Sequence, residues 1–416
     1  MRTRPRLLKT LVLAVPLTLG VAACTSGGGA GSSNSAETTA NSSGTIVIGA
    51  TLSLTGSLDA SGAPLEAGYA QEIADVNAAG GVAIGGAKEK LKLVVLDNGS
   101  NPSTAASQAS ELVQQDHAVA LLGSTTPQII LTTAQVAEQL HVPFLTSLMP
   151  VEAFANGDKQ GWRYSWDLFY NEQQQAANVA RELASVPGDK KVALFTDNDP
   201  DAVVERPLYE AAFKADGLDV VGDYTFPAGA TNFSSFIADA KAKGAQLLAG
   251  QMAPADGVAL WKQLKSSGLH PKAAFLAGAS DAGEWWQSLG STAQGTLSDG
   301  YWSPGQASPG QLATIAPTLG KKYGDSPGYA TAALGYAVAE VVTDALAKGG
   351  GTNPARLNAA IARTDAQTTA GPVKFSQTTH TATTPYYVSQ WQNGTLVQVR
   401  PLASGVTLDV PAAGLG

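Results

Sequence analysis

Short apolar runs rich in β-branched residues alternate with longer amphipathic stretches from Thr45 onward. Short runs of this kind are typical of buried strands, and longer stretches with a helical period are typical of amphipathic helices. In the first half of the chain the pattern predicts strands at 46–52, 91–97, 118–123 and 143–147, with helices at 64–79, 103–115 and 127–140. Such an alternation favours a parallel sheet covered by helices.

A second series of the same kind comes after the first. It predicts helices at 172–184, 205–216, 234–243 and 256–267, and strands at 192–196, 220–226, 246–251, 274–277 and 295–301. Two consecutive series predict an α/β fold with two sheets, and later helices at 329–348 and 354–364 are expected to return to the first lobe. Near the end, Asn393-Gly394 between two apolar runs predicts a β-hairpin, because this pair supplies the positive φ angles of a tight turn.

The N-terminus has the pattern of a targeting segment. Four basic residues within the first nine precede an apolar run, 11–19, that is too short to span a bilayer. This run leads into Val21-Ala22-Ala23-Cys24, where small residues before a cysteine indicate a bacterial lipobox. We expect a signal peptide at 1–23 and a Cys24 that carries acyl chains such as palmitate. Two such chains are enough for stable membrane anchoring. An ordinary secretory signal cut at the same place is the alternative.

The segment after the signal has a biased composition. Residues 25–44 are almost all Gly, Ser, Thr, Ala and Asn, so 24–44 is predicted to be an acylated cysteine and a flexible tether. Cys24 is the only cysteine, which excludes an internal disulfide. Removing the signal takes away four positive charges, so the net charge falls from −8 to about −12. This charge argues against nucleic acid as a partner.

Several short motifs occur in a fixed order: Leu54-Thr55-Gly56, Gly62, Asn77 to Val82, Asp97, Gly123, Val142-Pro143, Gly229 to Phe233 and Gly371 to Phe375. In this succession the chain resembles the leucine/isoleucine/valine-binding protein family over about 45–400. The resemblance implies a type I periplasmic binding fold, with two Rossmann-like lobes of parallel sheets joined by three crossovers. The three crossovers are expected near Trp162 to Trp166, near Tyr301 and near Gly371 to Phe375. Lobe 1 would then comprise 45–163 plus 302–370, and lobe 2 would comprise 164–301 plus 371–416.

The resemblance also implies a function. Its members are extracytoplasmic receptors of ATP-driven importers, so the expected partners are a small-molecule ligand, an ABC permease and its ATPase, with the receptor a monomer that lacks a cofactor. A ligand-sensing receptor on the same fold and an exported hydrolase are the alternatives. The hydrolase has little support, because the four histidines show no H-x-x-x-H spacing.

The candidate site begins with the loop Gly123 to Thr126 before a helix that starts at Pro127. Amides and hydroxyls there could bind a carboxylate, or Ser124 to Thr126 could simply cap the helix. The family's serine contact is replaced by Pro127, and its next contact falls at Met149 and Pro150, with Thr146 and Ser147 as approximate substitutes. An acidic family contact aligns with Ser280, beside Asp281. The ligand is therefore expected to be a branched-chain or related amino acid, an amide or an amine.

Aromatic and acidic residues complete the candidates. Trp166, Tyr170, Trp285, Trp286, Tyr301 and Trp302 are expected either to contact the ligand or to pack between helix and sheet. Three aspartates alternate after a predicted strand, at Asp197, Asp199 and Asp201. They could bind a cation, but the preferred interpretation is a solvated turn. The loop is not an EF-hand calcium loop, because Ala202 and Leu208 stand where that loop needs glycine and glutamate. No metal site is predicted. The predicted ligand-binding residues are Ser61, Ser124, Thr125, Thr126, Thr146, Ser147, Trp166, Asp201, Ser280, Asp281 and Tyr301.

Overall fold

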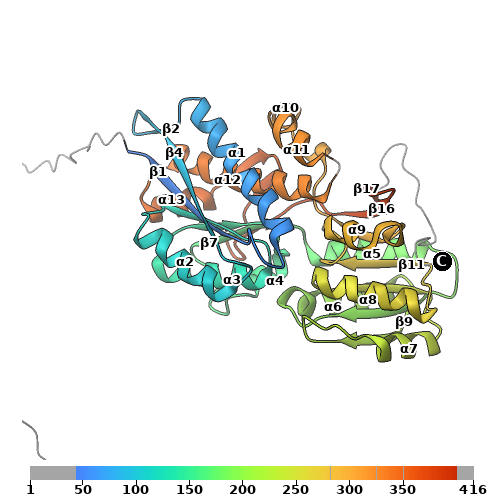
Figure 1. The fold of residues 1–416 in the computed structure, drawn as a ribbon. Coiled ribbons are helices and arrows are strands. Elements are labelled where there is room, and N and C mark those ends of the chain that lie inside the picture. Colours follow the sequence, from blue (N-terminus) through green and yellow to red (C-terminus); the bar gives the residue numbers. More distant parts are fainter. Residues whose placement is uncertain (1–43, 282, 325, 350, 401–416) are drawn as a thin grey trace, which may run out of the picture. The chain divides into compact units, whose positions relative to one another are not determined.

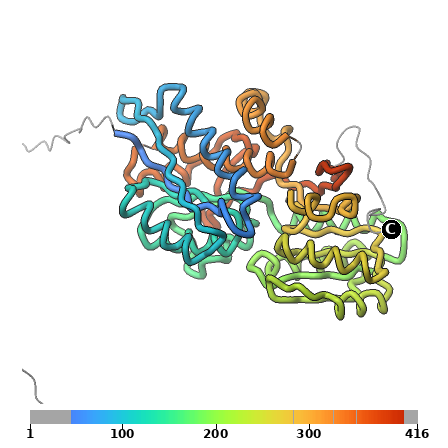
Figure 2. Tube along the Cα trace, viewed as in Figure 1, coloured from blue at the N-terminus to red at the C-terminus, as the bar shows by residue number. Residues whose placement is uncertain are grey.

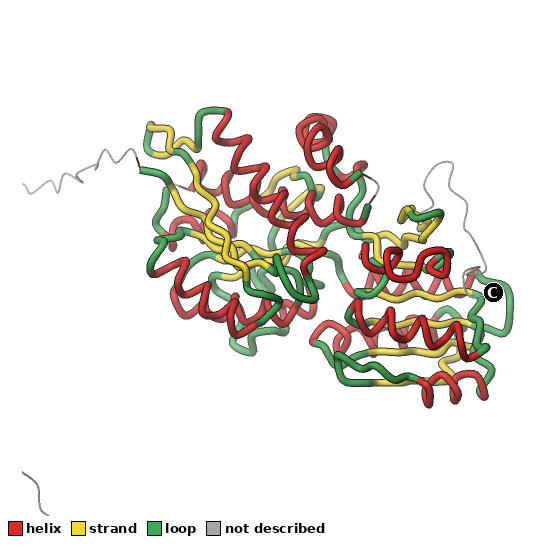
Figure 3. Tube along the Cα trace, viewed as in Figure 1, coloured by secondary structure: helices red, strands yellow, loops and turns green. Residues whose placement is uncertain are grey.

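A computed structural model describes residues 44–281, 283–324, 326–349 and 351–400 of the chain. The predicted signal peptide, Cys24, nearly all of the tether and the segment from 401 onward lie outside the described residues. The folded part contains two large sheets and two small ones (Figure 1). Helices cover both large sheets (Figure 3).

The first sheet has six strands in the order β15-β7-β6-β5-β1-β4, and every neighbouring pair is parallel. Its central strands are almost entirely buried, which explains their continuous apolar sequences. The strands are β1 (Ile46–Leu52), β4 (Leu91–Asp97), β5 (Ala120–Leu122), β6 (Phe144–Thr146), β7 (Ser165–Phe169) and β15 (Thr381–Thr383). The helices associated with this sheet are α1 (Asp59–Ala78), α2 (Pro102–Gln114), α3 (Pro127–Leu140), α4 (Val151–Ala155), α12 (Pro327–Gly349) and α13 (Pro354–Ala362).

The second sheet has seven strands in the order β17-β16-β12-β11-β10-β8-β9. It is parallel from β9 to β12 and ends in the antiparallel pair β16 and β17. The strands are β8 (Lys191–Thr196), β9 (Asp219–Thr225), β10 (Leu247–Gln251), β11 (Ala273–Ala277), β12 (Leu297–Gly300), β16 (Tyr387–Gln392) and β17 (Thr395–Arg400). Its helices are α5 (Glu172–Ser185), α6 (Pro200–Ala215), α7 (Ser234–Ala242), α8 (Pro254–Ser267) and α9 (Gly283–Leu289).

The remaining elements are short. Two antiparallel pairs, β2 (Val82–Ile84) with β3 (Ala87–Glu89) and β13 (Asp365–Thr368) with β14 (Gly371–Lys374), form the small sheets. Helical turns occur at Gly290–Ala293, Pro304–Gln306, Pro309–Ile315, Ala316–Gly320 and Lys321–Tyr323. The predicted hairpin is confirmed: Asn393 and Gly394 have φ angles of 53° and 87° between β16 and β17.

Most predicted elements are confirmed to within a few residues, and the largest errors are two helix starts. The helices predicted from 64 and 205 begin at Asp59 and at Pro200. Pro64 favours a start because proline is common in a first helical turn, but here it lies inside α1.

Strand pairing corrects two of the three expected crossovers. Strand β7 pairs with β6, and β15 pairs with β7, so both belong to the first sheet and not to the second lobe. The chain therefore changes sheets after Phe169, after Gly300 as expected, and between Thr383 and Tyr387. A local sequence pattern shows that a segment is extended, but it does not show which strand the segment pairs with. The division into two lobes remains a proposal, with its boundaries moved to these three points.

Helices α1 and α12 pack tightly although they are distant in sequence (Figure 2). A Cβ atom on Gly68 would lie 2.1 Å from the carbonyl oxygen of Ala332, so only glycine permits this approach. Among the described residues, α12 is the one helix long and apolar enough to cross a membrane, but 78% of its apolar window is buried inside the fold. We therefore interpret α12 as a core helix.

Candidate functional site

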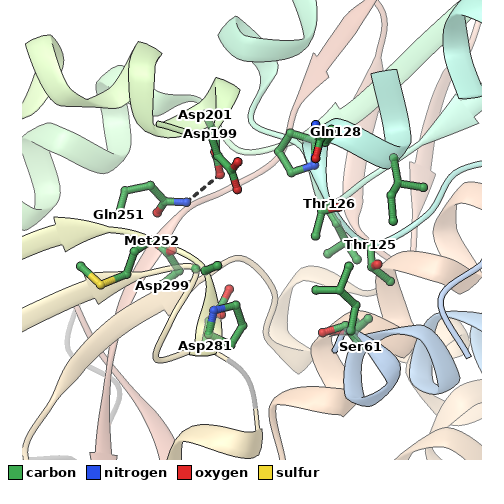
Figure 4. A pocket seen from close by; sticks show the side chains of 18 of the residues that line it. Ser61, Thr125, Thr126, Gln128, Asp199, Asp201, Gln251, Met252, Asp281 and Asp299 are labelled. Atoms are coloured by element: carbon green, nitrogen blue, oxygen red, sulfur yellow. Dashed lines mark hydrogen bonds between the residues drawn. The ribbon is translucent and has the colours of Figure 1, made fainter. Parts of the chain in front are cut away.

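A cavity with a volume of about 310 Å³ lies where the C-terminal ends of parallel strands from both large sheets come together (Figure 4). Ligands in α/β folds bind at this edge, because the loops there leave polar groups and helix N-termini accessible. The cavity is lined by the segments that follow β1, β4, β5 and β6 of the first sheet and β8, β10 and β11 of the second.

Hydroxyl groups form one wall. Ser61 from α1 and Thr125 and Thr126 from the loop after β5 line it, and they lie together in Figure 4. The Thr125 hydroxyl donates a 3.2 Å hydrogen bond to the Ser53 hydroxyl, which fixes its orientation. Thr126 precedes α3, and its side chain makes no capping hydrogen bond. The first turn of α3 thus faces the cavity with a positive helix end and without a side-chain cap.

Carboxylates form the opposite wall. Asp197, Asp199 and Asp201 follow β8, Asp281 follows β11 and Asp299 lies in β12. Figure 4 shows Asp199, Asp201, Asp281 and Asp299 across the cavity from the hydroxyl groups. Among the described residues that line this cavity, there is no lysine, arginine or histidine. This wall is therefore strongly acidic and lacks a compensating cation from the chain.

The pKa values of these carboxyl groups reflect their crowding. Burial, together with the charges of Asp199 and Asp201, raises the pKa of Asp197 to about 7. Burial raises the pKa of Asp201 to about 6, although its hydrogen bonds oppose the shift. Burial also raises the pKa of Asp281 and that of Asp299, and the charge of Asp299 adds to the shift at Asp281. A bound cation would relieve this repulsion.

Gln251 lies between these acids at the end of β10. Its Nε2 donates a 2.6 Å hydrogen bond to the Asp201 carboxylate. Its Oε1 is buried and has no hydrogen-bond partner, and the side chain is only 5% exposed. A buried amide oxygen without a donor is costly, so this atom is available to accept a hydrogen bond from a ligand.

A buried network supports the acidic wall from behind. Asp299 accepts hydrogen bonds from Gln175 at 3.0 Å and from the Tyr386 hydroxyl at 2.6 Å. Gln175 also donates to the Tyr170 hydroxyl, which in turn donates to Glu205. Burial raises the pKa of Glu205 well above its usual range. These contacts hold Asp299 in place before any ligand arrives.

Six of the eleven predicted ligand-binding residues line the cavity: Ser61, Thr125, Thr126, Asp201, Asp281 and Tyr301. The other five do not: Ser124, Thr146, Ser147, Trp166 and Ser280. All five are buried in the fold. In the loop after β5, Thr125 and Thr126 line the cavity, whereas the neighbouring Ser124 is buried and does not.

Specific contacts hold three of these five residues away from the cavity. The Thr146 side chain occupies the space above Gly123, and its hydroxyl donates to the Ser147 carbonyl. The Ser280 hydroxyl donates to the carbonyl oxygen of Leu276 at 2.6 Å. The neighbouring Asp281 lines the cavity instead. Trp166 stacks on His380 with ring centroids 3.8 Å apart, inside the first lobe.

The remaining aromatic candidates divide in the same way. Tyr170 and Tyr301 line the cavity, whereas Trp285 packs edge-on against Trp261 and Trp302 donates to the carbonyl of Thr369. Trp286 stacks on Trp391, with ring centroids 5.8 Å apart. The tryptophans are thus packing residues, as the alternative interpretation held.

Sequence reasoning also missed cavity residues. Interpreting the three aspartates after β8 as a solvated turn is wrong for Asp197 and Asp201, which are 1% and 8% exposed. Gln251, Asp299 and Leu148 line the cavity but were not predicted. The signal that could have found Gln251 and Asp299 is their position at the C-terminal ends of predicted parallel strands.

The described residues contain no group of three or more His, Cys, Asp or Glu side chains placed to hold a metal ion. The five carboxylates that line the cavity are spread over three strand ends, those of β8, β11 and β12. An elongated ligand with several polar groups suits this arrangement better than a single metal ion does.

Comparisons with known proteins agree with the fold. The periplasmic binding protein family matches residues 45–395. The chain is 25% identical to the Leu/Ile/Val-binding protein homolog 8 of Brucella abortus over 381 residues, which cover 86% of this chain and 90% of that protein. It is also 25% identical to homolog 7 of the same species over 356 residues, which cover 80% and 86% of the two chains.

Solved structures show the same fold. The leucine-binding protein LivK from Thermotoga maritima superposes with a TM-score of 0.74 at 22% identity, covering 85% of this chain and 97% of its own. LivJ from Streptococcus pneumoniae, solved with isoleucine, superposes with a TM-score of 0.73 at 22% identity, and the match covers 88% of this chain and 100% of LivJ. A solute-binding protein from R. palustris, solved with benzoate, superposes with a TM-score of 0.71 at 17% identity, and the match covers 86% of this chain and 96% of that protein.

Membership in this family implies a binding protein located outside the cytoplasm, and it accounts for a cavity between two sheets whose strands end at a common edge. The chain belongs to the periplasmic binding protein family, whose model matches residues 45–395.

Proposed function

We propose that this protein is the solute-binding lipoprotein of an ABC importer. It binds a small polar organic molecule, namely a branched-chain or related amino acid, an amide or an amine, between two closing lobes. The observation that carries the proposal is the polarity of the cavity, which has hydroxyl groups and a helix N-terminus on one wall and carboxylates on the other. A ligand with an anionic and a cationic end matches both walls.

The two ends of such a ligand have distinct partners in the proposal. A carboxylate would lie against Thr125, Thr126 and the first turn of α3, where hydroxyls and backbone N–H groups can donate to it. An ammonium would lie against the opposite carboxylates, among which Asp281 takes the place expected for Ser280. The LivJ neighbour was solved with isoleucine and the R. palustris neighbour with benzoate, so proteins of this fold accommodate carboxylate ligands.

Closure would couple binding to transport. The ligand stabilises the closed arrangement because only that state contacts it from both lobes. Helix α6 of the second lobe contacts α3 and α4 of the first, and Val204 of α6 packs against the apolar cluster around Phe154 and Trp162. This apolar contact is where the lobes would meet, and the closed form would then dock on its permease and ATPase.

A ligand panel tests the proposal. The chain from Ser43 onward, which holds the compact folded unit, would be heated with amino acids, amides and amines. A ligand present at 100 times its dissociation constant stabilises the native state by about 2.7 kcal/mol, so a true ligand is expected to raise the melting temperature clearly. If no compound in the panel shifts the transition, the proposed ligand class is wrong.

Loop variants locate the carboxylate end. Thr125→Ala combined with Thr126→Ala is expected to weaken an amino-acid ligand about tenfold or more, because each hydroxyl bonded to a charged group contributes about 1.5–3 kcal/mol. Ser124→Ala is the matched control, since its side chain is buried in the same loop but does not line the cavity. Isothermal titration measures both variants and the wild type. Equal loss in the control and the double variant would contradict this placement of the ligand.

The lipid anchor is a separate part of the proposal. Cys24→Ser is expected to move the protein from the membrane fraction to the soluble extracytoplasmic fraction, because stable anchoring needs the acyl chains on this residue. Metabolic labelling with a palmitate analogue and cell fractionation measure the change. A Ser32→Ala variant in the expected tether serves as the control. Persistent membrane association and labelling of Cys24→Ser would contradict the lipobox assignment.

A further inference from the structure

Building on the proposed function, we propose that the natural ligand carries two or more cationic nitrogens, as a diamino acid or a diamine does. A leucine-like ligand has only one. The inference concerns the same cavity and narrows the class of solute that it selects. It rests on the number of carboxylates, on their distribution over the strand ends and on an unsatisfied amide oxygen beside them.

The first step is charge. Five carboxylates line the cavity, and none of the described lining residues is basic. Gathering like charges in a partly buried site is unfavourable. The carboxyl groups therefore either keep their protons, as their raised pKa values indicate for the empty cavity, or are neutralised by cations of the ligand, and a single ammonium group neutralises one carboxylate. A ligand with one ammonium and one carboxylate would bring no net positive charge at all. An acidic wall of this size is therefore better matched by a dication.

The second step is spacing. The strand order β8-β10-β11-β12 places the aspartates after β8 two strands away from Asp281 and three strands away from Asp299. Neighbouring strands lie about 4.8 Å apart, so the β8 ends and the β11 end are about 10 Å apart at the backbone. The two acidic groups thus form separate positions. Two ammonium groups joined by a chain of a few carbons can reach both, whereas one ammonium cannot.

The third step is independent of charge. Gln251 is held by its bond to Asp201 between the two acidic positions, and its Oε1 is buried without a donor. This oxygen can accept a hydrogen bond from an N–H or O–H donor of the bound molecule. An apolar leucine-type side chain at this place would leave it unsatisfied, while a second amino or guanidino group would donate to it.

The opposite wall is compatible with two kinds of ligand, a diamino acid and a simple diamine. Ser61, Thr125 and Thr126 can receive the carboxylate of a diamino acid, or they can remain hydrated beside a simple diamine. The cationic chemistry is common to both. Lysine and cadaverine separate the two kinds of ligand, because these compounds differ only by the carboxylate. Norleucine has the unbranched carbon chain of lysine without the second amino group, so it isolates the effect of that group.

The experiment is isothermal titration of the chain from Ser43 onward at about pH 7.5, which is above the raised pKa values of Asp201 and Asp197, with lysine, ornithine, cadaverine, arginine, agmatine, norleucine, leucine and isoleucine. We expect at least one dicationic compound to bind about 100-fold or more tightly than leucine, which corresponds to about 2.7 kcal/mol. Tighter binding of lysine than of cadaverine would identify a diamino acid, and the reverse would identify a diamine. If leucine or isoleucine binds as tightly as every dicationic compound, the inference is overturned while the proposed function stands. If no compound binds, both fail.

Variants link the preference to the acidic wall. Asp201→Asn and Asp281→Asn are each expected to weaken the dicationic ligand tenfold or more, since each keeps the side-chain size and removes one charge. Asp216→Asn is the control, because Asp216 is exposed at the other end of α6 and does not line the cavity. Circular dichroism checks that all three variants are folded. Unchanged affinity in both cavity variants, with their fold intact, would overturn the inference.

Discussion

Replacing Trp166 with alanine is expected to lower the free energy of unfolding by about 3–5 kcal/mol and to leave the ligand affinity of the folded protein unchanged. The side chain is 1% exposed and lies in the core of the first lobe. It stacks on His380, meets Phe375 edge-on, and donates a 2.7 Å hydrogen bond to Asn358. Truncation would therefore leave a large cavity and an unpaired amide.

Urea unfolding measures the stability, and titration with whichever ligand the panel identifies measures the affinity. Trp286→Ala is the matched control, because this tryptophan is only partly buried and stacks on Trp391 in the second lobe. Its expected loss is clearly smaller. The opposite result for Trp166→Ala, with normal stability and abolished binding, would restore Trp166 to the ligand site and contradict its placement in the core.

The unliganded protein is expected to lose stability as the pH rises from about 5 to about 7.5, because its cavity aspartates bind protons more tightly than unfolded ones. In the unfolded chain an aspartate has a pKa near 3.9, whereas Asp201 and Asp197 in the fold have pKa values of about 6 and about 7. Between these values the native state binds more protons than the unfolded state. The stabilisation is therefore complete below about pH 4 and is lost as the pH rises through about 6 and 7.

The size of the effect follows from linkage. Each such carboxyl group changes the free energy of unfolding by up to about 1.4 kcal/mol per pH unit in this window. The groups that face Asp201 are Asp197, Asp199, Glu205 and Asp281, and each of them adds repulsion when it ionises. Asp97 and Asp239 have lowered pKa values, so their opposite contribution falls at more acidic pH.

Urea unfolding at about pH 5, 6 and 7.5 tests this expectation, since these values span the window between the unfolded and folded pKa values. Asp201→Asn is expected to flatten the profile and to stabilise the unliganded protein at the highest pH, while it weakens a cationic ligand. Asp216→Asn, at the exposed end of α6, is expected to follow the wild type. Wild-type stability that rises across this range would contradict the raised pKa values of the cavity carboxylates.

A charged ligand also changes the pH dependence of binding. A cation binds the ionised carboxylates, so its affinity is expected to increase through the same pH window in which the empty protein loses stability. The two trends have one cause. Repulsion between the cavity carboxylates destabilises the empty protein, and a cationic ligand relieves it. Binding sites commonly lower the stability of a protein in this way.

The fold could be predicted from sequence because its signals are local. Apolar runs such as 46–52 and 247–251 are buried on both faces and are therefore typical of parallel strands. The Asn393-Gly394 turn and the proline at the start of α3 act within a few residues. The order of motifs from Leu54 to Phe375 added the family, and with it the two-lobed arrangement.

The site could be predicted only in part. Thr125, Thr126, Asp281 and Tyr301 were found because they follow predicted strands or family motifs. Ser124, Ser147 and Ser280 were placed in the site by proximity in sequence, but their side chains are buried in the fold and do not line the cavity. Trp166 was included as a large aromatic near an expected hinge, and only packing shows that it belongs to the core.

By itself, the sequence determined the two β/α series, the hairpin and the family, because hydrophobic periodicity and turn chemistry depend on near neighbours. The tertiary structure decided that the strands at 165–169 and 381–383 join the first sheet. It also decided that Asp197, Asp201, Asp281 and Asp299 share one cavity. Both depend on contacts between residues far apart in the chain. Whether an aspartate is a solvated turn residue or part of a charged wall is set by the groups opposite it, and no local pattern carries that information.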